Sequence, residues 1–234
     1  MLLAIETATE VGGVAILEGD RLLHEVTLGE ETSYNSALLP AIDQSLRACG
    51  RTLEEIAAIA LSVGPGSFTG LRVGLATALG LCFGTERLIV PVQTLAALSL
   101  HGGGAPRIAP MLDARKGQVY SGLYGPGGEA LVPDRVTDPL PWLRSLEGQG
   151  PTVLLGPGAH LYQNEIETVL GVQARVLPVE LGWPRAGTVG RLGARLWGSG
   201  GARAPTEVEL LYLRPAEAEE HRAKPGHSPP KGII

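Results

Sequence analysis

Residues 4–16 read AIETATEVGGVAI, and residues 111–123 read MLDARKGQVYSGL. Both stretches run as an apolar strand to an acid, Glu6 or Asp113, and return through a short turn into a second apolar strand. The second acid follows the first by 107 residues. An internal duplication of this kind predicts two similar lobes built on one plan, with a cleft between them.

The segments that follow these stretches also repeat in a similar order. Turn residues and apolar periodicity predict an α/β fold of two duplicated βββαβα lobes. The expected strands are 2–6, 12–17, 22–28, 57–63, 88–92, 108–113, 119–124, 130–136 and 152–155, and the expected helices are 36–49, 68–84, 94–101, 140–147, 159–170 and 187–198. Because a glycine-rich linker follows residue 101, we expect lobes at 1–103 and 104–215, with a disordered tail at 216–234.

Composition excludes several classes of protein. The 234 residues carry 19 Lys and Arg against 24 Asp and Glu, a net charge of −5, without the basic stripe of a protein that binds nucleic acid directly. The uncharged stretch 88–106 is interrupted by Pro91 and three glycines, which argues against a membrane span. Cys49 and Cys82 lie in apolar stretches, so we expect buried, reduced thiols in a cytoplasmic protein with no membrane segment.

Metal chemistry is not expected from the histidines. They are His24, His101, His160, His221 and His227, and no two of them form a His-x-x-x-His pair. A metallopeptidase or a metal-dependent transferase brings histidine and carboxylate ligands together with a recognisable spacing. We therefore expect no protein-built metal site, no cofactor and no peptidase activity.

The glycine-rich loop at 64–70, GPGSFTG, joins a predicted strand to a predicted helix. It lacks the Lys-Ser/Thr pair of a P-loop, and its glycine spacing differs from the dinucleotide-binding fingerprint. A tight turn with Ser67 as the helix N-cap is the expected structure.

The segment between Glu55 and Glu86 contains one charged residue, Arg72. A helix at 68–84 that is apolar all round needs cover on every side, and the sheet of its lobe covers one side only. Small residues recur along this helix at spacings of three and four, which permits close helix packing. Either the lobe's own helix at 36–49 fills this stripe, or a partner protein does. We expect a partner surface that includes Leu38, Ile42, Gly70, Gly74, Thr77 and Leu81.

Two duplicated lobes, each opening with an acid-ended strand and a tight hairpin, resemble the actin-like superfamily of ATPases, sugar kinases and chaperones. Several stretches are more specific than the hairpins: Leu3-Ala-Ile-Glu6-Thr-Ala-Thr9, Ser36-Ala-Leu-Leu-Pro40, Gly64-Pro-Gly-Ser-Phe-Thr-Gly-Leu-Arg72-Val-Gly74, Asp113-Ala-Arg115, Val119-Tyr120 and Tyr212-Leu-Arg-Pro215. With these stretches, the chain resembles the TsaB (YeaZ) family of this superfamily over about residues 1–215.

The resemblance implies a non-catalytic accessory subunit in tRNA threonylcarbamoyladenosine biosynthesis. Members of the family pair with TsaD, the related subunit that transfers the threonylcarbamoyl group to the adenosine beside the anticodon. TsaE, a small ATPase, completes the assembly, and alone the family forms homodimers through the same helical surface. We expect contact with tRNA only through the complex. The family is also grouped with glycoprotease-like peptidases, and it usually has a histidine where this sequence has Tyr34.

The resemblance also assigns an ancestral role to the first hairpin. In active members of the superfamily, the acid at this position holds a metal-bound water, and nearby hydroxyls cradle phosphates. The matching residues are Glu6, Thr7 and Thr9, and Glu10 adds a negative charge where a phosphate would lie. We expect a vestigial phosphate hairpin, kept mainly for folding. The alternative is an active small ATPase or carbohydrate kinase, which Glu10 argues against.

Overall fold

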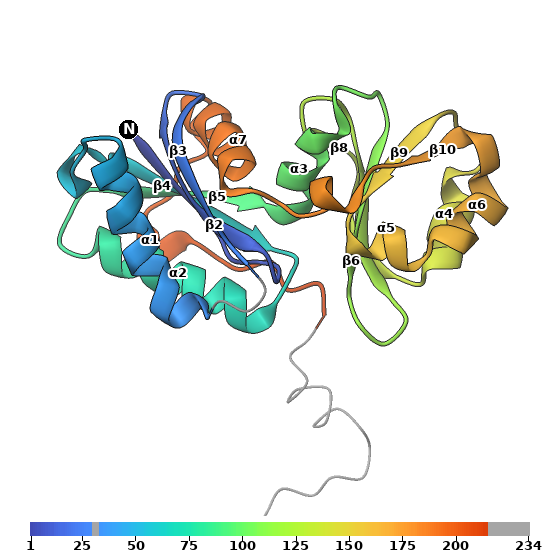
Figure 1. Cartoon of the computed structure of the whole chain (residues 1–234), viewed down its shortest axis with the longest axis horizontal. Helices are drawn as coiled ribbons and strands as arrows, with labels where there is room; N and C mark the ends of the chain where they lie inside the picture. Colours follow the sequence, from blue (N-terminus) through green and yellow to red (C-terminus); the bar gives the residue numbers. More distant parts are fainter. Residues whose placement is uncertain (30–32, 215–234) are drawn as a thin grey trace, which may run out of the picture.

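Two five-stranded sheets lie side by side, one from each half of the chain (Figure 1). The computed structural model describes residues 1–29 and 33–214. In the first sheet the strand order is β3-β2-β1-β4-β5, with β1 antiparallel to β2 and parallel to β4. Its strands are β1 (Leu2–Glu6), β2 (Gly12–Glu18), β3 (Arg21–Leu28), β4 (Ala58–Gly64) and β5 (Leu88–Gln93).

The second sheet repeats the arrangement of the first. Its order is β10-β9-β6-β7-β8, with β6 antiparallel to β7 and parallel to β9. Glu6 and Asp113 end the two central strands, β1 and β6, so the duplication read from the sequence is confirmed. The repeated topology confirms the predicted α/β fold of two duplicated lobes. The strands are β6 (Ile108–Asp113), β7 (Val119–Tyr124), β8 (Ala130–Thr137), β9 (Thr152–Leu155) and β10 (Ala174–Val176).

Helices cover both faces of the first sheet, because side chains alternate between the faces along each strand. Leu3 and Ile5 of β1 pack with the core under α1 and α2, whereas Leu2 and Ala4 pack with α7. In the second half, α4 and α6 lie against the far side of the sheet (Figure 1). The helices are α1 (Tyr34–Ala48), α2 (Phe68–Cys82), α3 (Thr94–Ser99), α4 (Pro139–Leu146), α5 (Pro157–Leu161), α6 (Gln163–Leu170) and α7 (Ala186–Gly198).

Helix α7 follows the second sheet in the chain but packs against the first, where it contacts all five strands, β1 to β5. The division at residues 103 and 104 assigns α7 to the second lobe, so on this point the structure differs from the sequence-based boundaries. Glycines allow the close approach: a Cβ at Gly190 would lie 2.2 Å from Cδ1 of Leu17, and one at Gly193 would lie 2.5 Å from Cβ of Ala60. The uncovered apolar face of the first sheet, rather than chain order, decides where this helix packs.

A single apolar core joins the two lobes on the side where α3 lies. It includes Val90 of β5, Leu95 of α3, and Ile108 and Leu155 from the second sheet, each almost completely buried. Separating the lobes on this side would expose these side chains to water, at a cost of about 25 cal/mol for each Å² of apolar surface. The lobes are therefore firmly connected on the α3 side.

Ser67 is the N-cap of α2, as predicted: its side chain accepts a hydrogen bond from the amide of Gly70 at 3.2 Å. Over residues 1–29 and 33–214, the helices are too short or too polar to cross a membrane. The segment 216–234, predicted to be a disordered tail, lies outside the described residues.

Candidate functional site

A cleft of about 850 Å³ opens where the two hairpins face each other. Four segments form most of its walls: residues 8–10 and 65–69 from the first half of the chain, residues 112–115 of the second hairpin, and residues 211–214 near the end of the described chain. Four further side chains complete the lining, and they are Tyr120, Pro157, Leu161 and Trp183. Concave sites lined by aromatic and a few polar groups are the usual places for ligands, so this cleft is the candidate site.

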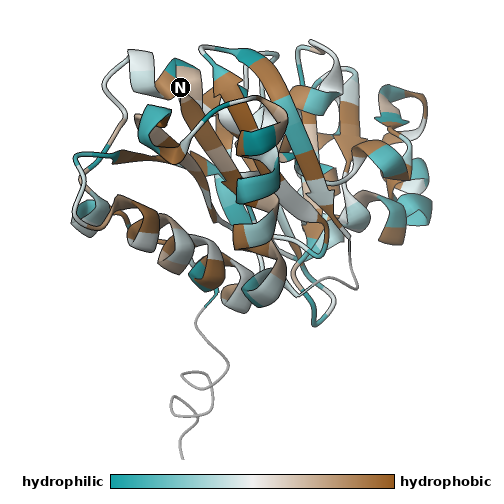
Figure 2. Ribbon diagram, turned by 60° about the vertical axis from the view of Figure 1, so that its left-hand side comes forward, coloured by the Kyte–Doolittle hydropathy of each residue, from teal (hydrophilic) through white to brown (hydrophobic). Residues whose placement is uncertain are grey.

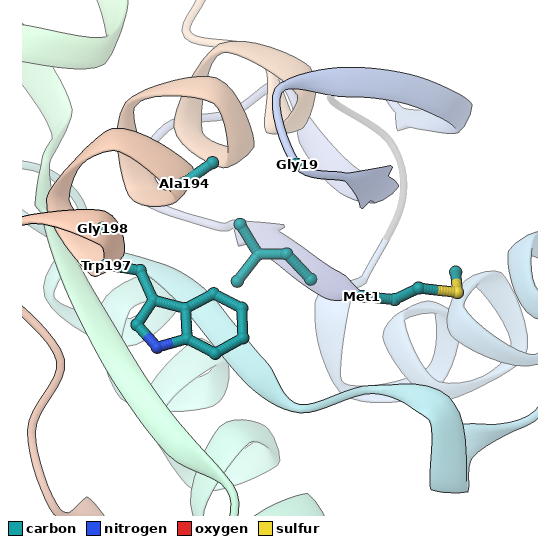
Figure 3. Close-up of a pocket in the computed structure, with 6 residues that line it drawn as sticks. Met1, Gly19, Ala194, Trp197 and Gly198 are labelled. Atoms are coloured by element: carbon teal, nitrogen blue, oxygen red, sulfur yellow. The ribbon is translucent and has the colours of Figure 1, made fainter.

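A second, smaller cavity of about 250 Å³ lies between the end of α7 and the start of β1 (Figure 3). Its lining is Met1, Leu2, Gly19, Ala194, Trp197 and Gly198. None of these residues carries a titratable side chain.

The first hairpin presents one of its three predicted phosphate-binding residues to the cleft. Glu6 and Thr7 are completely buried, and of the three predicted residues only Thr9 lines the cleft. Helix α2 covers Thr7: a Cβ at Gly70 would lie 2.0 Å from the backbone oxygen of Thr7, and one at Gly74 would lie 2.3 Å from its Oγ1. Of the expected vestigial phosphate hairpin, Glu6 and Thr7 therefore lie inside the protein, and Thr9 faces the cleft.

Burial changes the chemistry of Glu6. Its Oε1 accepts a hydrogen bond from the amide of Ala8 at 2.6 Å, and its Oε2 has no partner. Removal from water disfavours the charged form and raises the pKa of Glu6 to about 7, although the Ala8 amide acts in the opposite direction. Near pH 7 this enclosed carboxyl is therefore about half protonated, which makes it poorly suited to hold a metal-bound water.

Tyr34 closes the hairpin from the start of α1. Its hydroxyl donates a hydrogen bond to the backbone oxygen of Thr9 at 2.8 Å. Burial, together with the carboxylates of Glu6 and Glu10, raises the pKa of Tyr34, so the phenol stays protonated. The hydrogen bond from Tyr34 holds the hairpin backbone in place at Thr9.

Charged groups meet across the cleft. Arg115, from the second hairpin, contacts Glu10 of the first at 2.7 Å and Asp113 of its own hairpin at 3.2 Å. An incoming phosphate would therefore meet a cation already paired with two carboxylates. Over the described part of the chain, no group of three or more His, Cys, Asp or Glu side chains is placed to hold a metal ion. These residues do not fit the metal-bound nucleotide of an active phosphotransferase.

Replacing Arg115 by alanine should change stability little, although it removes a contact between the lobes. The side chains of Arg115 and Glu10 are 72% and 55% exposed, and exposed ion pairs contribute only about 0–1 kcal/mol. Chemical denaturation should give a free energy of unfolding within about 1 kcal/mol of wild type. Arg47→Ala, which removes the exposed ion pair with Asp43 inside α1, is the matched control. A much larger loss for Arg115→Ala would show that this pair ties the lobes together.

The predicted partner surface does not lie on the outside of the lobe. Leu38 and Ile42 are buried in the core, and Gly70 and Gly74 face Thr7. Two more residues of the stripe are half-buried: the hydroxyl of Thr77 donates to the backbone oxygen of Val73 at 2.9 Å, and Leu81 packs against the lobe's own core. Four of these residues are therefore covered within the chain, Gly70 and Gly74 by the first hairpin rather than by α1 as the intramolecular alternative expected, whereas Thr77 and Leu81 stay partly exposed.

A different face of α2 is exposed, and it was not predicted from the sequence. Its members recur at spacings of four and three, and all are exposed: Phe68, Arg72, Ala76, Leu79 and Phe83. We call these five residues the outer face of α2. Phe83 is 89% exposed, and Leu39 of neighbouring α1 is exposed as well. Figure 2 shows the α2 ribbon in brown and white with little teal. The same helical spacing that indicated the inner stripe would also have located this face.

Comparison with known proteins decides the family. A protein of Bacillus subtilis named "tRNA threonylcarbamoyladenosine biosynthesis protein TsaB" is 32% identical over 228 residues, which span 93% of this chain and 96% of that protein. The chain belongs to the TsaB (YeaZ) family. The TsaB protein of Haemophilus influenzae is 39% identical over 124 residues, about half of each chain (51%). Membership assigns the chain a role in tRNA threonylcarbamoyladenosine biosynthesis.

A solved structure and a family model agree with this membership. The TsaB-family structure described as "YeaZ from Pseudomonas aeruginosa" superposes with a TM-score of 0.75 at 28% identity, covering 91% of this chain and 99% of that one. A family model described as "TsaD: tRNA N6-adenosine threonylcarbamoyltransferase" matches residues 29–149. The matched range includes α1 and α2, so these helices belong to the part of the fold that TsaB and TsaD sequences share.

Proposed function

We propose that this chain is a non-catalytic, cytoplasmic subunit that pairs with a TsaD-type transferase and supports threonylcarbamoyl transfer to the adenosine beside the anticodon of tRNA. TsaE would complete the assembly, tRNA would be met only through the complex, and the chain would form a homodimer when alone. The observation that carries this proposal is the apolar outer face of α2.

The outer face of α2 has the composition of a protein contact. Monomeric soluble proteins rarely leave large apolar patches exposed, and the residues that dominate binding energy are enriched in aromatic side chains and arginine. Here Phe68 and Phe83 lie at the two ends of α2, and Arg72 is the charged residue between them. Such a face gains stability when a partner covers it.

The kind of partner follows from the shared helices. Because the TsaD family model matches residues 29–149, a TsaD-type chain carries segments related to α1 and α2. Two copies of one chain can associate through the same patch on both subunits, and two related chains can imitate that symmetry. The same face therefore serves a homodimer and a heterodimer, and the two assemblies exclude each other.

The enclosed hairpin supports a non-catalytic role. Glu6 and Thr7 are buried, and Arg115 is already paired with two carboxylates. Phosphoryl transfer relies on charged groups and metal ions that are free to meet the phosphates. No contact in this hairpin favours the alternative of an active ATPase or carbohydrate kinase.

Leu79→Arg tests the proposal. At an interface the new cation would face an apolar partner without a counter-charge, and unpaired buried charges cost about 2–5 kcal/mol, which weakens association by about thirtyfold or more. We expect a folded monomer by sedimentation equilibrium that no longer co-elutes with purified TsaD from the same organism. Val172→Arg, which adds the same charge at a fully exposed apolar position in the second lobe, should behave as wild type.

Two results would contradict the proposal. One is a folded Leu79→Arg variant that still dimerises and still binds TsaD, because the outer face of α2 would then not be the contact. The other is equal loss of binding in Leu79→Arg and Val172→Arg, which would mean that added positive charge, rather than its position, prevents association.

A further inference from the structure

The segment after α7 passes around the edge of the first sheet. At Arg203 its backbone pairs with edge strand β5: the Arg203 amide donates to the oxygen of Ile89 at 2.8 Å, and the Ile89 amide donates back at 3.0 Å. Val208 and Leu210 then pack into the core under α1 and α2. The segment thus starts on the α7 face of the sheet and ends on the opposite face, between the lobes (Figure 1).

Residues 211 and 212 attach this segment to the first lobe beside the cleft. The Leu211 amide donates to the backbone oxygen of Val63 at 2.8 Å. The ring of Tyr212 lies 5.1 Å from the ring of Phe68, and its hydroxyl accepts a hydrogen bond from Nε of Arg72 at 3.3 Å. At Leu211 and Tyr212, the segment is therefore attached to the first lobe.

Arg214 then reaches the other lobe. Its Nη1 donates to the backbone oxygen of Ala114 at 2.5 Å, and its Nη2 donates to Oε1 of Gln118. Both acceptors belong to the second hairpin, which is closed by a hydrogen bond from the Ala114 amide to the Gln118 oxygen at 2.9 Å. The guanidinium of Arg214 is therefore hydrogen-bonded to both ends of the turn at 114–118, on the opposite wall of the cleft.

We propose that residues 203–214 form a strap that sets the width of the cleft, with Arg214 as the positioning residue that fastens it to the second hairpin. On the α3 side, the lobes share one apolar core and are firmly connected. On the cleft side, the lobes are joined by polar contacts that include the bonds of Arg214 to the second hairpin and the exposed Glu10–Arg115 pair. Exposed ion pairs contribute little free energy, so the part-buried hydrogen bonds of Arg214 contribute most to holding the two walls of the cleft together.

Arg214→Ala tests the strap by hydrogen exchange. Loss of two charge-assisted hydrogen bonds should raise exchange at the Leu211 amide and in residues 114–118 by about tenfold or more, because both walls of the cleft open more often. Exchange in β1 and β6 should stay unchanged. Arg214→Lys, whose single ammonium replaces one of the two bonds, should give an intermediate increase.

Arg203→Ala is the matched control, because the guanidinium of Arg203 donates only to the nearby backbone oxygens of Gly200 and Ala202. This variant should leave exchange at Leu211 and at 114–118 within about twofold of wild type, since its backbone pairing with β5 is kept. The proposal is overturned if Arg214→Ala leaves both regions at wild-type rates. It is equally overturned if exchange rises by the same factor over the whole chain, because Arg214 would then stabilise the fold and not the width of the cleft.

Discussion

Gly70→Ala is expected to lower the free energy of unfolding by about 2–3 kcal/mol, the usual cost of overpacking a close contact. The added Cβ would lie 2.0 Å from the backbone oxygen of Thr7, an atom at the end of a central strand that cannot rotate away. Either α2 or the first hairpin must shift. Urea unfolding of the variant should show the loss as a lower midpoint with an unchanged slope.

Gly80→Ala is the matched control in the same helix. Nothing lies within 4 Å of its added Cβ, so only the helix propensity changes, and alanine is favoured over glycine by about 1 kcal/mol. Gly80→Ala should therefore raise stability while Gly70→Ala lowers it. Because Gly80 is exposed on α2, both variants are measured at two protein concentrations to separate unfolding from association. Equal effects of the two substitutions would show that α2 does not press on the hairpin.

Glu6→Gln is expected to change how stability depends on pH. The carboxyl has an ordinary pKa of 4.5 when unfolded and a pKa of about 7 when folded. Between these values the folded state holds a proton that the unfolded state has released, so wild-type stability falls as pH rises from 4.5 to about 7. At about 1.4 kcal/mol for each pKa unit, the full loss is roughly 3 kcal/mol.

The glutamine variant keeps an acceptor for the Ala8 amide but cannot ionise. It should match wild type below pH 4.5, where Glu6 is protonated in both states, and exceed it by roughly 3 kcal/mol above pH 7. Asp134, whose pKa burial raises to about 6, also contributes to the wild-type profile, but it is common to both proteins and cancels in the difference. Glu86→Gln removes an exposed carboxyl from the same lobe and controls for net charge. Parallel pH profiles for wild type and Glu6→Gln would contradict the burial of this group.

Several elements were not predictable from local pattern. The helix expected over 159–170 is divided at Tyr162 into α5 and α6, because the backbone of Tyr162 leaves helical geometry. Strand β10, Ala174–Val176, was missed because three residues have no measurable periodicity, and it is a strand only through its pairing with β9. For β10, the neighbouring strand and not the local sequence decides the conformation.

The candidate site also has parts that were predictable from the sequence and parts that were not. The sequence motifs located both hairpins and the loop before α2, which line the cleft, because turn residues and acid-ended strands are local signals. The pairing of Arg72 with Tyr212, and of Arg214 with the second hairpin, joins residues that are far apart in the chain. No pattern of residue spacing predicts contacts between residues so far apart, so the strap at 203–214 could not be predicted before the fold was known.

By itself, the sequence determined the duplicated plan, the order of most strands and helices, and membership of the family, since all three depend on patterns along the chain. Only the tertiary structure decided which face of α2 is covered. The stripe of Gly70 and Gly74 and the stripe of Phe68 and Leu79 share one helical period and differ only by rotation about the axis. Small residues let the hairpin approach the first stripe closely, so the larger side chains remain outside. Periodicity defines the stripes of a helix, but contact with a neighbour selects the buried one.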